Sequence, residues 1–436
     1  MPNKVLIITY YWPPSGGGGV QRWLKFSKYL PEFGWEPIIF TPENPEFELK
    51  DESLFNDVHE SIEVLKFPIW EPFSIYKKMF SKSASKNLKQ GVVKEKSQLS
   101  VFDKMIVWIR GNIFIPDPRV FWVKPSVKFL CDYIQDNEID IVVTSGPPHS
   151  MHLIGRGLKR KIGVEWIADF RDPWSDWDIL DKLKTSGIAK AIHKRKELTV
   201  LNEADIVLTV TNRLGSLFAK KIESTKTKVI TNGIDESDIT IDEPQFNKFR
   251  ITHIGLLNDL RDPTELWNVL SELCNENEDF KSDLEILLAG TISSTILAKL
   301  NSVDISRESI VVKDYIEHQD VFKYYQQSTI LLLLMNQTSN ADWLIPAKLF
   351  EYLGANKEVL ALGSQESEVH EILKNAGNDG VLEYSNRVKL KDRIMKSYEN
   401  FKVQKKTTNY IGVENFYRKN LTQELVSLLD DIKLIE

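Results

Sequence analysis

The feature that most constrains the fold is a pair of unbroken apolar runs separated by one helical segment. Ile330 to Met335 contains no polar side chain, and Val359 to Leu362 forms a second such run. A short run that is apolar at every position predicts a strand buried on both faces of a parallel sheet. Between the runs, Pro346 suits the first turn of a helix, and Leu349 and Leu353 give that helix an apolar stripe. The segment therefore predicts strand, loop, helix and strand.

The same alternation of strands and helices divides the chain into two similar halves. At 436 residues the chain exceeds the size at which one hydrophobic core stops growing. We therefore expect an α/β protein of two doubly wound parallel-sheet domains, at 1–240 and 241–408, with a C-terminal helical segment at 409–436. The expected strands cover 4–9, 37–41, 62–65, 140–145 and 204–210, then 249–255, 284–289, 310–313, 330–335 and 359–362.

Composition and charge exclude several function classes. Hydrophobic residues make up 42% of the chain and charged residues 27%, which is typical of a globular protein. Cys131 and Cys274 are far apart in sequence, form no paired metal-ligand motif and favour a reducing compartment. No apolar run approaches the ~18–20 residues of a membrane span. Together these two features predict a cytoplasmic protein. Because the net charge is −6, we do not expect the protein to bind nucleic acid.

One segment, at about 70–110, departs from the acidic average of the chain. It carries nine lysines and arginines against three acidic residues, with aromatic side chains among them. This composition is typical of a segment that contacts an anionic membrane surface. It suggests peripheral association with the inner face of the plasma membrane, and a solvated surface insertion is the alternative.

A glycine-rich loop follows the first expected strand. Gly16 to Gly19 are consecutive glycines, and a helix is expected from about Val20 to Phe33. Consecutive glycines let the backbone approach a ligand and present N–H groups to it. The spacing matches neither the GxGxxG dinucleotide motif nor a P-loop. We expect a ligand-binding loop, and a simple tight turn is the alternative.

Polar residues follow two later strands of the first half. His149 and His152 come directly after an expected strand, where a histidine can polarise a hydroxyl or pair with a phosphate. Structural turn histidines are the alternative. Asp169 and Asp172 end a further strand and are candidates to bind sugar hydroxyls, unless Asp169 pairs with Arg171. We take His149 and Asp172 as candidates for acceptor binding, and we expect no metal site.

In the second half, two cations and a carboxylate occupy strand-end positions. Gly255 ends the first strand, and Arg261 stands just before the next helix, which favours binding of a diphosphate. Lys348 and Glu351 are three apart and share one face of the helix after Pro346. Lys348 suits a phosphate, and Glu351 suits the two hydroxyls of a ribose. Phosphate and ribose would then lie along the helix in the order in which they occur in a nucleotide. An ordinary helix-start arginine and a surface Lys–Glu pair are the alternatives.

Four segments together carry a family resemblance. They are the Pro13–Arg22 loop, the Asn232–Asp235 segment, the Gly255–Arg261 loop and the Pro346–Tyr352 segment, in this order along the chain. Through them, essentially the whole chain resembles family 4 retaining glycosyltransferases of the GT-B type, as found in bacterial surface-polysaccharide clusters. The resemblance implies two Rossmann-like domains that face each other across a cleft, and a closing helix that crosses back onto the first domain.

The resemblance also implies residues that bind a nucleotide-sugar donor. Glu351 matches the glutamate that holds the ribose hydroxyls, and Arg261 matches the basic residue that neutralises the leaving diphosphate. Gly18 and Gly19 match the loop that closes on that diphosphate. The backbone at Ile316 matches the place where the base is read.

The resemblance also implies a catalytic histidine, and the chain departs from the family motif at one position. His152, or alternatively His149, falls in the loop that supplies a histidine near the sugar. Trp343 stands where the first glutamate of the family's E-x7-E motif is expected, and Asp342 is a candidate substitute. The family's second basic residue has no counterpart at its usual place, and Lys348 is a candidate to replace it.

The reaction that the resemblance implies is transfer of a hexosyl or N-acetylhexosaminyl group from a nucleotide diphosphate to an acceptor hydroxyl. It implies retention of configuration and no metal or other cofactor, and it implies a glycan or lipid-linked acceptor. One alternative is a nucleotide-sugar epimerase or hydrolase on the same architecture. The other is a non-catalytic binding protein, which the substitution at Trp343 supports.

Overall fold

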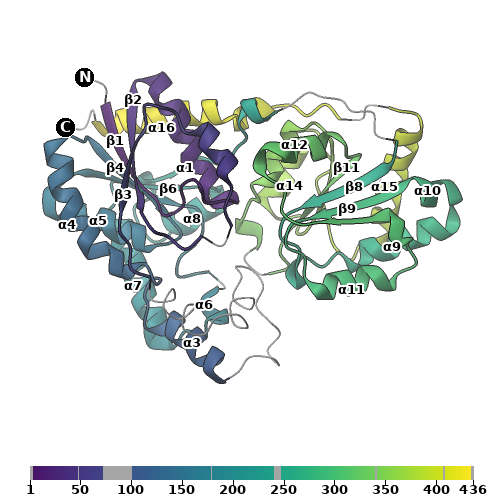
Figure 1. Ribbon diagram of the computed structural model, residues 1–436, viewed down its shortest axis with the longest axis horizontal. Helices are drawn as coiled ribbons and strands as arrows, with labels where there is room; N and C mark the ends of the chain where they lie inside the picture. The colour runs from purple at the N-terminus through teal and green to yellow at the C-terminus, as the bar shows by residue number, and fades with distance from the viewer. Residues whose placement is uncertain are drawn as a thin grey trace. The chain divides into compact units, whose positions relative to one another are not determined.

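The described residues form two compact units, shown in Figure 1. The first, unit 1, combines Met1–Thr231 with Arg418–Glu436, and the second, unit 2, is Asn232–Tyr417. The chain therefore passes from one unit to the other after residues 231 and 417, whereas the sequence predicted boundaries at 240 and 408. Most of the basic segment expected to contact a membrane, at 72–100, lies outside the described residues. The computed structural model describes residues 3–47, 49–71, 101–177, 179–239, 247–338, 341–405 and 408–433, with the backbone alone at 101–103.

In its described part, unit 1 contains a seven-stranded sheet with the order β3-β2-β1-β4-β5-β6-β7. Neighbouring strands run parallel throughout. The chain order reverses between β1 and β4, and the carboxyl ends of strands at such a point are where α/β proteins bind ligands. The strands are β1 (Asn3–Ile8), β2 (Trp35–Pro42), β3 (Glu63–Phe67), β4 (Ile141–Gly146), β5 (Glu165–Phe170), β6 (Ile206–Thr209) and β7 (Thr227–Val229).

Alternate residues of the central strands of unit 1 face two separate cores. Leu6 and Ile8 of β1 belong to a core that includes residues of α4, α5, α7 and α8. Val5 and Ile7 belong to a second core with α1 and α16. The sheet therefore has helices on both faces (Figure 1). The helices are α1 (Gly18–Tyr29), α3 (Val101–Asn112), α4 (Val120–Asp136), α5 (Ser150–Ile162), α6 (Ile179–Lys182), α7 (Gly187–Glu203), α8 (Asn212–Ala219) and α16 (Arg418–Lys433), with 3-10 turns η1 (Leu30–Phe33), η2 (Glu52–Asp57) and η4 (Ser224–Lys226).

The C-terminal helix α16 belongs to unit 1, although it follows unit 2 in sequence. Leu421, Leu425 and Leu429 lie in the same core as α1. Trp35 Nε1 donates a hydrogen bond to Asp430 Oδ1 at 3.0 Å. The spacing of these leucines gives the helix one apolar face, and that face completes one side of the unit 1 core.

The described part of unit 2 contains a six-stranded sheet with the order β10-β9-β8-β11-β12-β13, again parallel. Leu332 and Leu334 of β11 face a core with α9, whereas Leu331 and Leu333 face a core with α13. Burial on both faces explains why this strand is apolar at every position. The strands are β8 (Phe249–Ile254), β9 (Leu284–Ala289), β10 (Ile310–Lys313), β11 (Ile330–Leu334), β12 (Glu358–Leu362) and β13 (Val381–Leu382).

The prediction of two doubly wound parallel sheets is confirmed. The helix expected around Pro346 begins at Lys348, as α13 (Lys348–Gly354). Among the described residues, none of the helices combines the length and apolar character needed to cross a bilayer. The remaining helices of unit 2 are α9 (Thr264–Glu276), α10 (Glu278–Asp283), α11 (Ser294–Ser302), α12 (His318–Gln326), α14 (Glu368–Asn375) and α15 (Arg387–Lys402), with 3-10 turns η5 (Glu236–Asp238), η6 (Asp259–Arg261), η7 (Arg307–Ser309), η8 (Ala341–Trp343) and η9 (Val413–Phe416).

Candidate functional site

In unit 2, Lys348 lies directly against the glycine that follows the first strand. Gly255 has a φ of 134°, in the region that favours glycine. A Cβ added at Gly255 would lie 2.1 Å from Lys348 Nζ. The loop after β8 and the first turn of α13 therefore meet at the carboxyl edge of the sheet, and Gly255 leaves the space that the ammonium occupies.

Arg261 lies at the end of η6, on the loop that Gly255 begins. Its Nε donates to Asn336 Oδ1 at 2.8 Å, and its Nη1 donates to Leu256 O at 3.1 Å. Within the described residues, the Lys348 ammonium has no hydrogen bond or ion pair. Burial lowers the pKa of Lys348 to about 8, an effect that the Arg261 charge reinforces and Glu351 opposes. Two partly buried cations without a directly bound carboxylate are typical of an anion-binding site.

Glu351 lies one helical turn beyond Lys348 on α13. Tyr325 Oη, from α12, donates to Glu351 Oε2 at 2.6 Å. Tyr325 is fully buried, and burial together with the Glu351 charge raises the pKa of its phenol, so it remains a donor. Oε1 of Glu351 accepts no hydrogen bond from the described residues. The carboxylate is thus fixed on one side and keeps acceptor capacity for hydroxyl groups on the other.

The remaining predicted positions of unit 2 lie on two loops at the carboxyl ends of strands. Ile316 lies between β10 and α12 and packs against the core around α13. Trp343 and Asp342 lie in η8, between β11 and α13, and both are half-buried. Asp342 is therefore on the loop where the resemblance requires a glutamate, and its replacement of that glutamate stays a prediction.

In unit 1, Arg171 joins the glycine loop to the loop after β4. Its Nη1 donates to Gly19 O at 2.6 Å, and its Nη2 donates to Pro147 O at 2.5 Å. Helix α1 begins at Gly18, which is exposed. Because the first amides of a helix have no intrahelical acceptor, Gly18 and Gly19 place N–H groups at the carboxyl edge of the sheet.

The two candidate histidines are buried beneath that edge. His149 stacks on Trp174 with ring centroids 4.9 Å apart, and His152 stacks on Phe170 at 4.1 Å. His152 Nδ1 lies 2.9 Å from Thr144 Oγ1, and the residue has no exposed surface. Burial lowers the pKa of His152 to about 3 and the pKa of His149 well below its usual value. Both rings are neutral near pH 7, and in this structure His152 offers no surface that a sugar can touch.

The two candidate aspartates have different surroundings. Asp169 is buried and accepts from Arg22 Nε at 3.1 Å and from Trp23 Nε1 at 2.7 Å. Its ion-pair partner is thus Arg22 of α1, and the alternative prediction that Asp169 pairs with Arg171 is wrong. Asp172 is half-buried, has no hydrogen bond or ion pair with a described residue, and burial raises its pKa. Asp169 therefore holds α1 on β5, whereas Asp172 keeps acceptor oxygens available.

Sequence reasoning missed three residues that support the cationic site of unit 2. Asn336 fixes Arg261, and it directly follows the apolar run, so a polar residue at a strand end could have been noticed. His253 Nδ1 lies 3.0 Å from Leu332 O, and burial followed by the Lys348 charge lowers its pKa to about 3. His253 is consequently neutral and adds no further positive charge. The third residue is Tyr325, whose phenol donates to Glu351. No sequence pattern distinguishes it from the other tyrosines.

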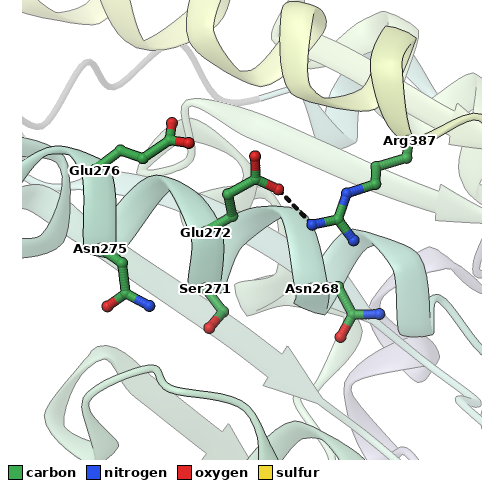
Figure 2. Close-up of a pocket in the computed structure, with 6 residues that line it drawn as sticks. All are labelled: Asn268, Ser271, Glu272, Asn275, Glu276 and Arg387. Atoms are coloured by element: carbon green, nitrogen blue, oxygen red, sulfur yellow. Dashed lines mark hydrogen bonds and ion pairs between the residues drawn. The ribbon is translucent and has the colours of Figure 1, made fainter.

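Figure 2 shows a surface hollow along α9, and none of its lining residues belongs to the site described above. Its charged groups are paired with one another: Arg387 binds Glu272, and Lys391 binds Glu272 and Glu276 at 2.6 and 2.8 Å. Exposed pairs of this kind contribute little energy. Since the hollow lies along a helix rather than at strand ends, we assign it no function. Its lining residues are Asn268, Ser271, Glu272, Asn275, Glu276 and Arg387.

Comparisons with known proteins support the fold. No protein-family model matches the chain, and no curated protein matches it. Among solved structures, a glycosyltransferase from Rickettsia africae ESF-5 is 15% identical with a TM-score of 0.59, covering 99% of this chain and 98% of its own. A trehalose-6-phosphate protein of E. coli bound with UDP-2-fluoro glucose is 12% identical with a TM-score of 0.59, covering 98% and 99%.

A third solved structure, a putative UDP-N-acetylglucosamine 2-epimerase from Listeria monocytogenes, is 10% identical with a TM-score of 0.59, covering 99% of this chain and 96% of its own. At these identities the similarity establishes the fold alone. The chain therefore has the GT-B fold that the resemblance implied, over its whole length. Membership of family 4 stays a prediction.

Proposed function

We propose that this protein is a glycosyltransferase that moves a sugar from a nucleotide-diphosphate donor to an acceptor hydroxyl. One observation carries the proposal: Arg261 and Lys348 lie at one strand edge of unit 2, with the Glu351 carboxylate one helical turn beyond Lys348. This arrangement supplies cations for a diphosphate and an acceptor for a ribose diol. The similarity to a protein that binds UDP-2-fluoro glucose supports the same donor class.

In this proposal, unit 2 stabilises the nucleotide diphosphate that leaves during the reaction. As the glycosidic bond breaks, negative charge grows on the diphosphate, and preorganised cations lower the energy of that transition state. Arg261 and Lys348 would contact the diphosphate, Glu351 would accept from the ribose hydroxyls, and the backbone at Ile316 would lie beside the base. Gly255 allows the ammonium of Lys348 to approach the strand end.

The finer assignments belong to the same proposal. In unit 1, the amides of Gly18 and Gly19 would bind the diphosphate, and Asp172 would bind the acceptor. We give the buried His149 and His152 the role of supporting the loop after β4, with no sugar contact. We further propose retention, a hexosyl or N-acetylhexosaminyl donor, a glycan or lipid-linked acceptor of surface polysaccharide, and action in the cytoplasm or at the inner membrane face. Activity in EDTA tests the expected metal independence.

The experiment that tests the function begins with a thermal-shift panel of UDP, GDP, ADP and their sugars. We expect one nucleotide class to raise the melting temperature, because ligand binding to the folded state stabilises it. The stabilising donor is then incubated with and without candidate acceptors. Rapid turnover without an acceptor would favour an epimerase or hydrolase, which the Listeria similarity keeps as the second candidate. Absence of any nucleotide binding would favour the non-catalytic alternative.

Replacing Glu351 with glutamine is expected to weaken nucleotide binding. The amide keeps the hydrogen bond from Tyr325 but loses the negative charge that accepts from the ribose, at a cost of about 1.5–3 kcal/mol. Calorimetry measures the change in affinity. Glu371→Gln is the matched control, because Glu371 is an exposed residue of α14. Equal affinity in the wild type and Glu351→Gln would contradict the ribose assignment.

Replacing Gly255 with alanine is expected to weaken nucleotide-diphosphate binding about tenfold, because the new Cβ displaces the Lys348 ammonium from its contact position. Gly377→Ala is the control, since Gly377 also has a positive φ, of 88°, but no described atom lies within 4 Å of its Cβ position. Calorimetry on both variants separates the collision with Lys348 from backbone strain. Equal losses in the two variants would show that strain alone is responsible.

A further inference from the structure

Unit 1 has a hollow of about 260 Å³ beside its glycine loop that the donor assignments do not use. It is lined from four places: the segment after β1, the end of β2, the segment that follows β2, and β3. β2 lies between β1 and β3 in the sheet, so the hollow lies at the carboxyl edge where α/β proteins bind ligands. Its volume is several times the ~30 Å³ of a water molecule, which leaves room for a small organic anion.

Two lysines from different segments line this hollow. Lys50 and Lys66 are exposed, and neither ammonium has a hydrogen bond or ion pair with a described residue. Glu43 is the acidic residue of the lining, so the lining is positive on balance. The backbone of Lys50 forms a β-bridge with Ser15, which holds this cation against the glycine loop. Lys28 of the same unit, by contrast, pairs with a carboxylate at 3.0 Å.

The wall of the hollow also contains a buried hydroxyl without a partner. Thr41 is 3% exposed, and its Oγ1 makes no hydrogen bond with any described residue. Buried hydroxyls are normally satisfied by a protein group, a water or a ligand, so Thr41 is a candidate donor to an oxygen bound in the hollow. The other walls include Trp12, Pro14 and Phe47, which present rigid apolar surface.

We propose that this hollow binds a phosphate monoester carried by the acceptor substrate. Lys50 and Lys66 would contact the phosphate oxygens, Thr41 would donate its hydroxyl, and the apolar walls would pack against the organic group. A phosphorylated sugar and a phosphorylated lipid that carries a free hydroxyl share this chemistry, and geranyl phosphate stands for the lipid in the binding test. The assignment to the acceptor rests on the proposed function, whereas binding of the phosphate itself does not.

The test is calorimetry on the full chain with glucose 6-phosphate and geranyl phosphate, against glucose and glucuronate. We expect one phosphate ester to bind, more weakly as salt rises. Lys50→Ala and Lys66→Ala should each weaken it about tenfold, because each removes a charge-assisted contact. Lys128→Ala, which removes an exposed cation of α4, is the matched control and should leave the affinity unchanged. The tighter ester identifies the source of the phosphate.

Thr41→Val adds a variant of nearly equal shape. It should weaken the phosphate ester several-fold without lowering the melting temperature, since the hydroxyl has no protein partner among the described residues to lose. A fall in melting temperature with unchanged affinity would indicate a purely structural role and count against the site.

Further outcomes separate this inference from the proposed function. Nucleotide binding together with equal phosphate affinity in the wild type, Lys50→Ala and Lys66→Ala overturns the inference and leaves the function standing. If the protein binds the phosphate ester through the two lysines but binds no nucleotide, the inference stands and the proposed function is overturned. Glucuronate bound as tightly as the phosphate esters would overturn the choice of phosphate.

Discussion

Replacing Arg261 or Lys348 with alanine is expected to lower the rate of sugar transfer by about 10²–10³-fold with the fold intact. Each side chain is a preorganised cation at the strand edge of unit 2, and the charge it would stabilise grows as the diphosphate leaves. Lys348 has no ion-pair partner among the described residues, so its removal leaves no buried carboxylate unpaired. Steady-state kinetics with the donor found by thermal shift give the rates, and circular dichroism checks the fold.

Two surface variants of unit 2, Arg307→Ala and Lys389→Ala, are matched controls because both side chains are exposed. The pH profile adds an independent measurement. Since the pKa of Lys348 is about 8, the fraction of free enzyme with a protonated ammonium falls above that pH, and kcat/KM should fall with it. Lys348→Arg should remove this decline, because arginine stays charged. A wild-type profile that stays level at alkaline pH would contradict the assignment.

Acidification from about pH 7 to about pH 5 is expected to destabilise unit 1 more than unit 2. Burial lowers the pKa of His152 to about 3 and that of His193 to about 4, and it lowers the pKa of His149 well below its usual value. A histidine that is neutral when folded and titrates at about 6.5 when unfolded stabilises the protein fully above 6.5. As the pH falls below 6.5 towards the pKa of the histidine in the folded state, the free energy of unfolding decreases. The decrease at pH 5 is about 2 kcal/mol per histidine.

His152 and His193 together would cost unit 1 about 4 kcal/mol, a large part of the whole stability of many domains, and His149 shifts the stability in the same direction. In unit 2, His253 contributes one such loss. Urea unfolding followed by hydrogen exchange and mass spectrometry reads the two units separately. His149→Phe should reduce the pH dependence by one proton, because an apolar ring fills the stacking position on Trp174. His59→Gln is the exposed control, and an equal effect of both variants would refute the explanation.

The fold was predictable because short apolar runs leave few structural choices. β11 is apolar at every position, which favours a strand buried on both faces, and similar apolar runs in both halves predict two parallel sheets. The ends of elements were less predictable. Helix α13 begins at Lys348, two residues after Pro346, although Leu349 N already donates to Pro346 O at 3.0 Å.

The candidate site was predictable where chemistry and strand ends coincide in sequence, as for Lys348 and Glu351. It was not predictable where tertiary packing decides. His152 follows a strand just as an exposed ligand-binding residue would, yet its ring turns inward against Phe170. Asp169 looked like a partner for its neighbour Arg171, but it pairs with Arg22, far away in sequence. Contacts of this kind depend on the order of strands in the sheet, which local patterns do not encode.

The placement of α16 has a consequence for how the chain is made. Unit 2 is one continuous segment, so a ribosome delivers all of it before the last helix of unit 1 emerges. Until then, the apolar face of α1 lacks Leu421, Leu425 and Leu429, which complete its side of the core. We therefore expect nascent chains to expose this apolar face of α1 until α16 emerges, and chaperones that shield apolar surfaces to bind unit 1 during that time.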